Sequence, residues 1–147
     1  MCLFFVFEIL THLVNYLQCP EKVENIVTRS NLIASVFIHG DAFHQKLVAI
    51  VVPDPEASAA WAKENGVSDV DVKSLAKNDA FRKAVVTDMD KVGKKYGLQS
   101  FEIPKDAFIE PEPFSMDTVL TPTLKMQRKK ALEYYSTQLD AMLGAPA

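Results

Sequence analysis

The sequence predicts an α+β fold: a small antiparallel sheet of about three strands with helices packed on it. Two apolar, strand-like runs at 33–39 and 46–52 stand close together, joined by a Gly-Asp turn. Segments with helical spacing and helix-start signals follow at 54–66 and 78–97. The chain has 147 residues, of which 48% are hydrophobic, and this is enough for one domain with a buried core.

The elements of the first half follow from local signals. Pro20 and the acidic residues after it are favoured in the first turn of an opening helix. The run 46–52 is almost wholly apolar, which is typical of a central strand covered on both faces. Asp54 and Pro55 supply a cap and a first residue for the next helix, and Gly66 ends it.

The second half is predicted from spacing and from prolines. The helix over 78–97 has an apolar residue every three or four positions, at Phe81, Val85, Met89, Val92 and Tyr96. The segment 101–109 is expected to be a third strand, at a sheet edge because Pro104 lacks a backbone donor. A last helix is expected to begin at Thr121 and Pro122, with one apolar face formed by Leu132, Tyr135, Leu139 and Met142.

Residues 1–19 differ in composition from the rest, so the sequence divides into an apolar segment over 1–19 and a domain over 20–147. The segment does not fit a signal peptide, because no Lys or Arg precedes the apolar run and no small-residue cleavage site follows it. A membrane span needs about 20 mainly apolar residues, and Glu8 interrupts this one. Membrane association through residues 1–17 is therefore not favoured. The alternatives are a short buried helix and a translated intron end.

Composition excludes several classes of function. With 16 Lys+Arg against 19 Asp+Glu the net charge is −3, so no nucleic-acid partner is expected. Cys2 and Cys19 are the two cysteines and have no zinc-ligand spacing, so no metal site is expected. His39 and His44 flank the predicted turn and are expected at the surface. With 5 glycines the chain has no Gly-rich phosphate loop.

Chemistry-bearing side chains gather in the segment 120–130, which reads Leu-Thr-Pro-Thr-Leu-Lys-Met-Gln-Arg-Lys-Lys. If a helix begins at Thr121, these cations crowd its first turns, where the positive end of the helix dipole disfavours them. A phosphate or carboxylate held there would meet backbone donors and an ammonium group together. A solvated basic face is the other interpretation of the same run.

Several ordered motifs resemble a known family. They are Pro-Glu-Lys-Val-Glu-Asn-Ile (20–26), Val-Phe-Ile-His-Gly-Asp (36–41), Val-Ala-Ile-Val-Val-Pro-Asp-Pro (48–55), Trp-Ala-Lys (61–63), Ser-Phe-Glu (100–102) and Leu-Thr-Pro-Thr-Leu-Lys-Met-Gln-Arg (120–128). Together they resemble the C-terminal domain of eukaryotic long-chain fatty acyl-CoA synthetases, in the AMP-forming adenylating superfamily. The resemblance covers residue 20 to about residue 143, and residues 1–19 lie outside it.

The resemblance implies a ligase that acts in two steps. Similar enzymes first join a fatty acid to AMP from ATP, releasing pyrophosphate, and then move the small C-terminal domain so that CoA attacks the acyl-adenylate. Lys125 matches the family lysine that reaches the active site in the first step, so it is the candidate catalytic residue, and Thr121, Pro122 and Thr123 would fix its loop. ATP, CoA and Mg²⁺ are implied for the complete enzyme, and none is expected to bind this chain tightly alone. The implied locations are the cytosolic face of the endoplasmic reticulum, the mitochondrial outer membrane and the peroxisome.

The chain also departs from the family. Family members carry a large N-terminal domain with the phosphate loop, the adenine pocket, the metal-binding acids and the acyl tunnel, and the sequence contains none of these. That large adenylation domain is the implied partner, and the chain is expected to be an incomplete ligase fragment that is inactive alone. The alternative is a non-enzymatic module that docks on a full-length synthetase or on a membrane. An exposed apolar patch near Phe114 and Met116 would favour docking.

Overall fold

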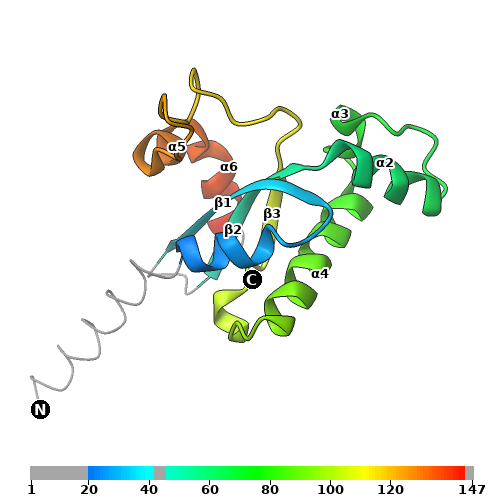
Figure 1. Ribbon diagram of the computed structural model, residues 1–147, viewed down its shortest axis with the longest axis horizontal. Helices are drawn as coiled ribbons and strands as arrows, with labels where there is room; N and C mark the ends of the chain where they lie inside the picture. Colours follow the sequence, from blue (N-terminus) through cyan, green and yellow to red (C-terminus); the bar gives the residue numbers. More distant parts are fainter. Residues whose placement is uncertain (1–19, 42–45, 145–147) are drawn as a thin grey trace, which may run out of the picture.

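The computed structural model describes residues 20–41 and 46–144. A helix over residues 20–27 comes first. It is followed by β1 (Ile33–Asp41), β2 (Lys46–Pro53), α2 (Pro55–Glu64), α3 (Val72–Leu75), α4 (Asp79–Lys95), the 3₁₀ turn η1 (Ser100–Glu102), β3 (Asp106–Ile109), α5 (Arg128–Tyr134) and α6 (Ser136–Leu143) (Figure 1). The apolar segment 1–19 and the turn residue His44 lie outside the described residues.

The sheet is mixed, which corrects the expectation of an antiparallel one. β1 and β2 form an antiparallel hairpin, with Val36 opposite Val51, whereas β3 lies parallel to β2, with Ala107 beside Ala49. The reason is the connection between β2 and β3, which passes through α2, α3 and α4, because parallel neighbours are joined by a helical crossover. The strand order β1-β2-β3 makes β2 the central strand and β3 an edge strand, and this confirms both predicted positions.

Helices cover both faces of the sheet, so the domain has three layers (Figure 1). The helix over 20–27 packs on one face together with α2, α3 and α4, and α5 and α6 pack on the other. The side chains of β2 alternate between the two cores. Leu47, Ala49 and Val51 belong to the first core, and Val48 and Ile50 belong to the second.

The helix α4, the longest among the described residues, confirms most of the predicted apolar face. It begins after Asn78, whose side chain accepts two backbone N–H groups of the first turn at 2.9 and 3.3 Å. The predicted face is fully buried at Phe81, Val85 and Met89. At the far end, Tyr96 reaches the surface and is 43% exposed. Trp61 of α2 packs edge-on against Phe81 with ring centroids 5.1 Å apart, so this indole is a packing residue.

The third strand is shorter than expected. It begins at Asp106, and the chain just before it turns through η1. The carboxylate of Glu102 accepts the backbone N–H of Gln99 at 2.8 Å, and the N–H of Glu102 donates to the carbonyl of Gln99 at 2.9 Å. These local bonds favour a turn over an extended strand, and Pro104 then leads into β3.

The last helix begins later than expected and is divided. It starts at Arg128 instead of Thr121, and Tyr135 separates α5 from α6. Residues 121–127 form a loop, because the hydroxyl of Thr121 accepts the backbone N–H of Lys125 at 3.0 Å and so competes with helical bonding. The predicted apolar face is confirmed: Leu132 packs against the second core, in which Tyr135, Leu139 and Met142 are buried.

Candidate functional site

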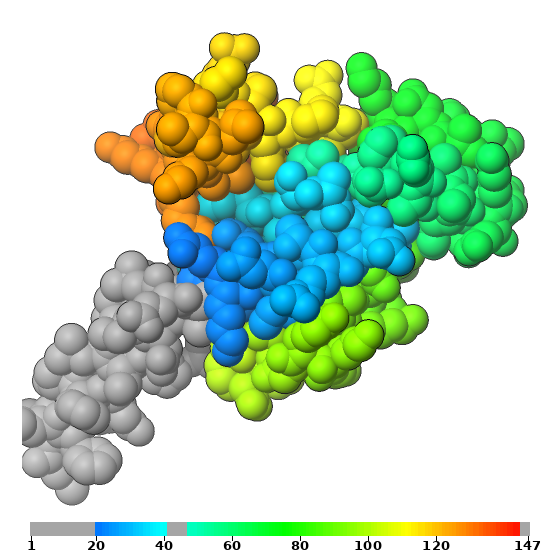
Figure 2. All heavy atoms as spheres, in the orientation of Figure 1, coloured from blue at the N-terminus to red at the C-terminus, as the bar shows by residue number. Residues whose placement is uncertain are grey.

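Lys125 lies in a loop between β3 and α5 that folds back on itself. Leu120 and Met126 form an isolated antiparallel bridge across this loop. Inside the bridge, the N–H of Thr121 donates to the carbonyl of Lys125 at 2.8 Å. The segment around it, yellow to orange in Figure 2, forms an edge of the molecule, and Arg128 at its end bonds Glu24 of the helix over 20–27. The lysine is therefore presented by a small backbone-closed hairpin at the surface.

Threonine side chains stabilise this turn. The hydroxyl of Thr121 lies 2.9 Å from that of Thr123 and also accepts the N–H of Lys125 at 3.0 Å. The N–H of Leu124 donates to the carbonyl of Thr121 at 2.9 Å. These bonds support the loop-fixing role that the resemblance implies for Thr121 and Thr123. Pro122 adds a fixed φ angle without needing a backbone acceptor.

The side chain of Lys125 is exposed and makes no hydrogen bond or ion pair with the described residues. Lys129 and Lys130, in the first turn of α5, are exposed as well. Arg128 differs from them, because its guanidinium is held by Glu24. Of the four cations in the segment 120–130, Arg128 is thus bound within the fold, and Lys125, Lys129 and Lys130 are exposed.

The residue before Lys125 has an unusual backbone. Leu124 has a φ of 60°, the left-handed region, and is 69% exposed. This conformation costs an L-residue roughly 1–2 kcal/mol, and Asn tolerates it better. Leu124→Asn is therefore expected to raise the free energy of unfolding by about 0.5–1 kcal/mol in urea denaturation. Leu124→Ala removes the same apolar side chain but keeps the strain, so an equal gain from alanine would contradict this explanation.

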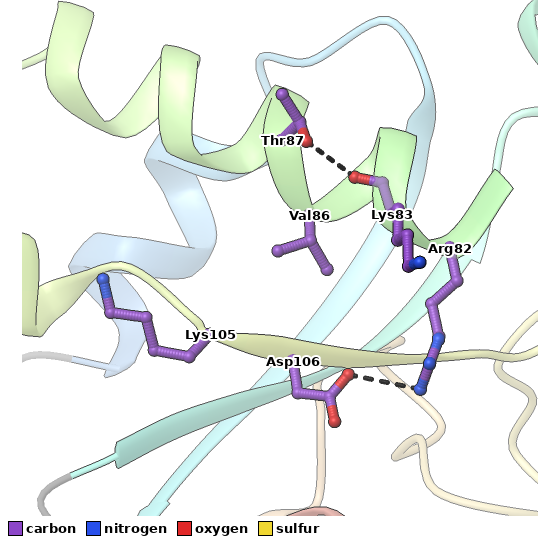
Figure 3. Close-up of a pocket in the computed structure, with 6 residues that line it drawn as sticks. All are labelled: Arg82, Lys83, Val86, Thr87, Lys105 and Asp106. Carbon is purple, nitrogen blue, oxygen red and sulfur yellow. Dashed lines mark hydrogen bonds and ion pairs between the residues drawn. The ribbon is translucent and has the colours of Figure 1, made fainter. Parts of the chain in front are cut away.

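A hollow of about 310 Å³ lies between α4 and β3 and is separate from the Lys125 loop (Figure 3). Arg82 on α4 lies 3.4 Å from the carboxylate of Asp106 and 3.4 Å from that of Asp79. The hydroxyl of Thr87 donates to the carbonyl of Lys83 at 2.8 Å. The arginine is thus neutralised by carboxylates on two elements, and the lining contains no nucleophile with a base beside it. We assign no chemistry to this hollow.

Neither a metal-binding cluster nor a membrane-spanning helix occurs among the residues that the structure describes. Within 20–41 and 46–144, no three His, Cys, Asp or Glu side chains are grouped so as to hold a metal ion. No helix in those ranges is long and apolar enough to cross a membrane.

Burial and the carboxylate of Glu110 raise the pKa of Tyr135, which is a core residue 2% exposed. That phenol stays neutral at physiological pH and is no second reactive group.

Glu24 is a residue near the loop to which the sequence assigns no role. Its carboxylate accepts two hydrogen bonds from Arg128, both 2.9 Å long, across 104 positions of sequence. Its sequence signal is weak, because acidic residues are common near the start of any helix. Only the packing of the helix over 20–27 beside the Lys125 loop brings the two groups together.

The sequence is similar to known proteins over most of its length. No family model matches it. It is 42% identical over 124 residues to long-chain-fatty-acid–CoA ligase 5 of Rattus norvegicus, covering 84% of this chain and 18% of that protein. It is 42% identical over 122 residues to ligase 1 of Homo sapiens, covering 82% and 17%. Against the peroxisomal long chain acyl-CoA synthetase 6 of Arabidopsis thaliana it is 38% identical over 130 residues, covering 86% and 18%. The chain thus spans less than a fifth of these relatives' length.

Solved structures with the same fold are adenylation domains. The adenylation domain of a carboxylate reductase from Mycobacterium chelonae matches 84% of this chain and 17% of its own, with a TM-score of 0.70 and 30% identity. The corresponding domain from Segniliparus rugosus, in complex with AMP and a co-purified carboxylic acid, matches 87% of this chain and 18% of its own, with a TM-score of 0.72 and 29% identity.

Sequence and structure comparisons therefore agree with each other and with the family resemblance. Both place the matching region inside much longer adenylate-forming enzymes, of which it makes up only a small share. The α+β fold of the described residues is the fold of that matching region. The chain is a partial chain of the AMP-forming long-chain fatty acyl-CoA synthetase family.

Proposed function

We propose that this chain is the C-terminal lid portion of a long-chain-fatty-acid–CoA ligase and supplies Lys125 to the adenylation step. The complete reaction converts ATP, a fatty acid and CoA into acyl-CoA, AMP and pyrophosphate. One observation carries the proposal: Lys125 is exposed on a loop held by its own backbone and threonine bonds, and its ammonium makes no bond to the described residues. A cation held in this way is available to a second surface.

The chemistry of the first step suits a lysine. A carboxylate oxygen of the fatty acid attacks the α-phosphorus of ATP, and the bond from that phosphorus to the bridging oxygen breaks to release pyrophosphate. Negative charge is concentrated between the carboxylate and the α-phosphate as they approach. The ammonium of Lys125, a compact charge on a long stem, would lie between these groups and stabilise both without transferring a proton.

The rest of the active site would come from the large adenylation domain. The described residues have no metal-holding cluster, so they do not fit Mg²⁺, and the chain has no Gly-rich phosphate loop. We therefore place the sites for ATP, Mg²⁺ and the acyl-adenylate on that domain, and we expect the chain to be inactive alone. A peroxisomal relative supports the peroxisome as one location. The endoplasmic reticulum and the mitochondrial outer membrane stay as expectations from the family.

A non-enzymatic docking module is the second candidate, and the surface does not favour it. Met116 is 54% exposed, as docking would require. Phe114 instead packs on the second core, with its ring centroid 6.2 Å from that of Tyr135. Of the two side chains expected to form a docking patch, one is therefore exposed and the other is partly buried.

A segment exchange tests the proposal. Rat ligase 5 is prepared intact, without the segment that matches this chain, and with residues 20–143 of this chain in its place. We expect removal to abolish acyl-CoA formation and the exchange to restore it. A second arm adds the 147-residue chain to the shortened enzyme. If both arms stay inactive while the exchanged protein is folded by circular dichroism, the chain is not a working lid.

A further inference from the structure

Glu24, on the helix over 20–27, makes an unusually complete set of contacts for a surface carboxylate. Arg128 donates to both of its oxygens at 2.9 Å, and the N–H of Ile38 on β1 donates to Oε1 at 2.9 Å. The guanidinium also donates to the carbonyl of Ile38 at 3.2 Å and lies 5.5 Å from the centre of the Phe37 ring. Both bonds to Glu24 come from Nη2, and Nη1 is the nitrogen that donates to Ile38, so contacts at two nitrogens orient the guanidinium.

The pair is partly shielded from water, more so on the carboxylate side. The side chain of Glu24 is 17% exposed and that of Arg128 is 36% exposed. Burial raises the pKa of Glu24, and the Ile38 N–H and the Arg128 charge lower it by less. These two donors therefore offset part of the penalty that burial imposes on the charged carboxylate. Partly buried charge pairs of this kind are costly to break, because the remaining partner keeps its desolvation penalty.

Arg128 ties this contact to the lysine loop. It is three residues after Lys125 and directly follows Gln127, whose N–H donates to the carbonyl of Val119 at 2.8 Å. The side-chain amide of Gln127 also donates to the carbonyl of Leu120 at 3.0 Å. The part of the loop after Lys125 is thus bound through Gln127 to the part before it. Through Arg128 the same part is bound to Glu24 and to β1.

We propose that Glu24 is a positioning residue for Lys125, acting through Arg128. It holds the part of the loop that follows the lysine against β1. The Lys125 side chain therefore projects from the domain in a fixed direction. The inference deepens the proposed function and rests on it for its catalytic meaning. A purely structural role for the pair predicts something different, namely that breaking it loosens the whole domain and not the loop alone.

Amide hydrogen exchange on the full 147-residue chain separates the two roles. Glu24→Gln keeps an acceptor for Ile38 but removes the charge, and its matched control is Asp90→Asn. That control breaks an exposed carboxylate pair with Lys94 on α4. We expect Glu24→Gln to speed exchange at the amides of Thr121 and Gln127 about tenfold or more, with core amides of β2 unchanged. The control is expected to change none of these rates.

Two results would overturn the inference. One is an unchanged exchange rate in the loop, and the other is faster exchange spread evenly over β2 and α4. Neither result depends on catalysis, so neither bears on the proposed function. In the exchanged ligase, Glu24→Gln is expected to slow acyl-adenylate formation and to leave the rate of the CoA step unchanged. Arg128→Lys is expected to form the acyl-adenylate at a rate between those of the parent and Glu24→Gln. If Lys125→Ala slows the first step and Glu24→Gln does not, the positioning role fails and the proposed function stands.

Discussion

Lys125→Ala in the exchanged ligase is expected to slow acyl-adenylate formation about 100- to 1000-fold. Removing one preorganised donor from a developing anion costs about that much in other acyl-transfer sites, or roughly 2.7–4 kcal/mol of transition-state stabilisation. The effect should fall on kcat more than on KM for the fatty acid, because the ammonium acts where charge concentrates in the transition state. Pyrophosphate exchange measures this step directly.

The second step provides the internal contrast. Acyl-CoA formation from preformed acyl-adenylate is expected to be nearly unchanged in Lys125→Ala, because the lysine acts in adenylation. Lys129→Ala is the matched control: Lys129 is an exposed lysine four positions later on α5. It should leave both steps near the parent rate. Equal loss in both steps, or an equal effect of the control, would mean that Lys125 acts through general charge or stability.

Phe81→Ala is expected to lower the free energy of unfolding by about 3–5 kcal/mol. Phe81 is fully buried on α4 and packs edge-on against Trp61 with ring centroids 5.1 Å apart. Removing the ring leaves a cavity between α2 and α4 and also forfeits the aromatic pair. A loss of this size is a large part of the total stability of a small domain. Urea denaturation followed by circular dichroism measures it.

A second phenylalanine serves as the control. Phe101 lies in η1 and is 69% exposed, so Phe101→Ala makes the same chemical change without opening the core. Its effect on the free energy of unfolding is expected to stay within about 0.5 kcal/mol. Similar losses in the two variants would show that the core around α4 is not packed as described.

The fold class and most elements follow from the sequence because their signals are local. The cap and proline at Asp54 and Pro55 begin α2, and the helical spacing after Asn78 defines the buried face of α4. Apolar composition alone marks β2 as central. Each of these features depends on residues within a few turns of one another, and sequence patterns report such relations well.

The mistaken expectations involve competition between local and distant bonds. The antiparallel sheet was the wrong arrangement although the helices between β2 and β3 were predicted, and a helical crossover already favours a parallel pair. The helix expected at Thr121 is replaced by a loop, because that hydroxyl bonds to the Lys125 amide. Spacing rules count positions and do not weigh such side-chain bonds.

The candidate site likewise has one residue that a local motif indicates and one that depends on a distant partner. The motif makes Lys125 the candidate, and the structure adds that it is exposed on a closed loop. Glu24 was not identified, because its partner Arg128 lies 104 positions away. A pair of that separation is visible only once the helix over 20–27 and the loop are seen packed together.

The most direct test of the central claim is a crystal structure of the exchanged ligase with a non-hydrolysable acyl-adenylate analogue. The account predicts the ammonium of Lys125 within hydrogen-bond distance, about 3 Å, of the oxygens that correspond to the carboxylate and the α-phosphate. It also predicts that the Glu24 and Arg128 pair stays intact beneath the loop. A closed, adenylation-competent arrangement with Lys125 facing solvent, and another cation at those oxygens, would contradict the claim.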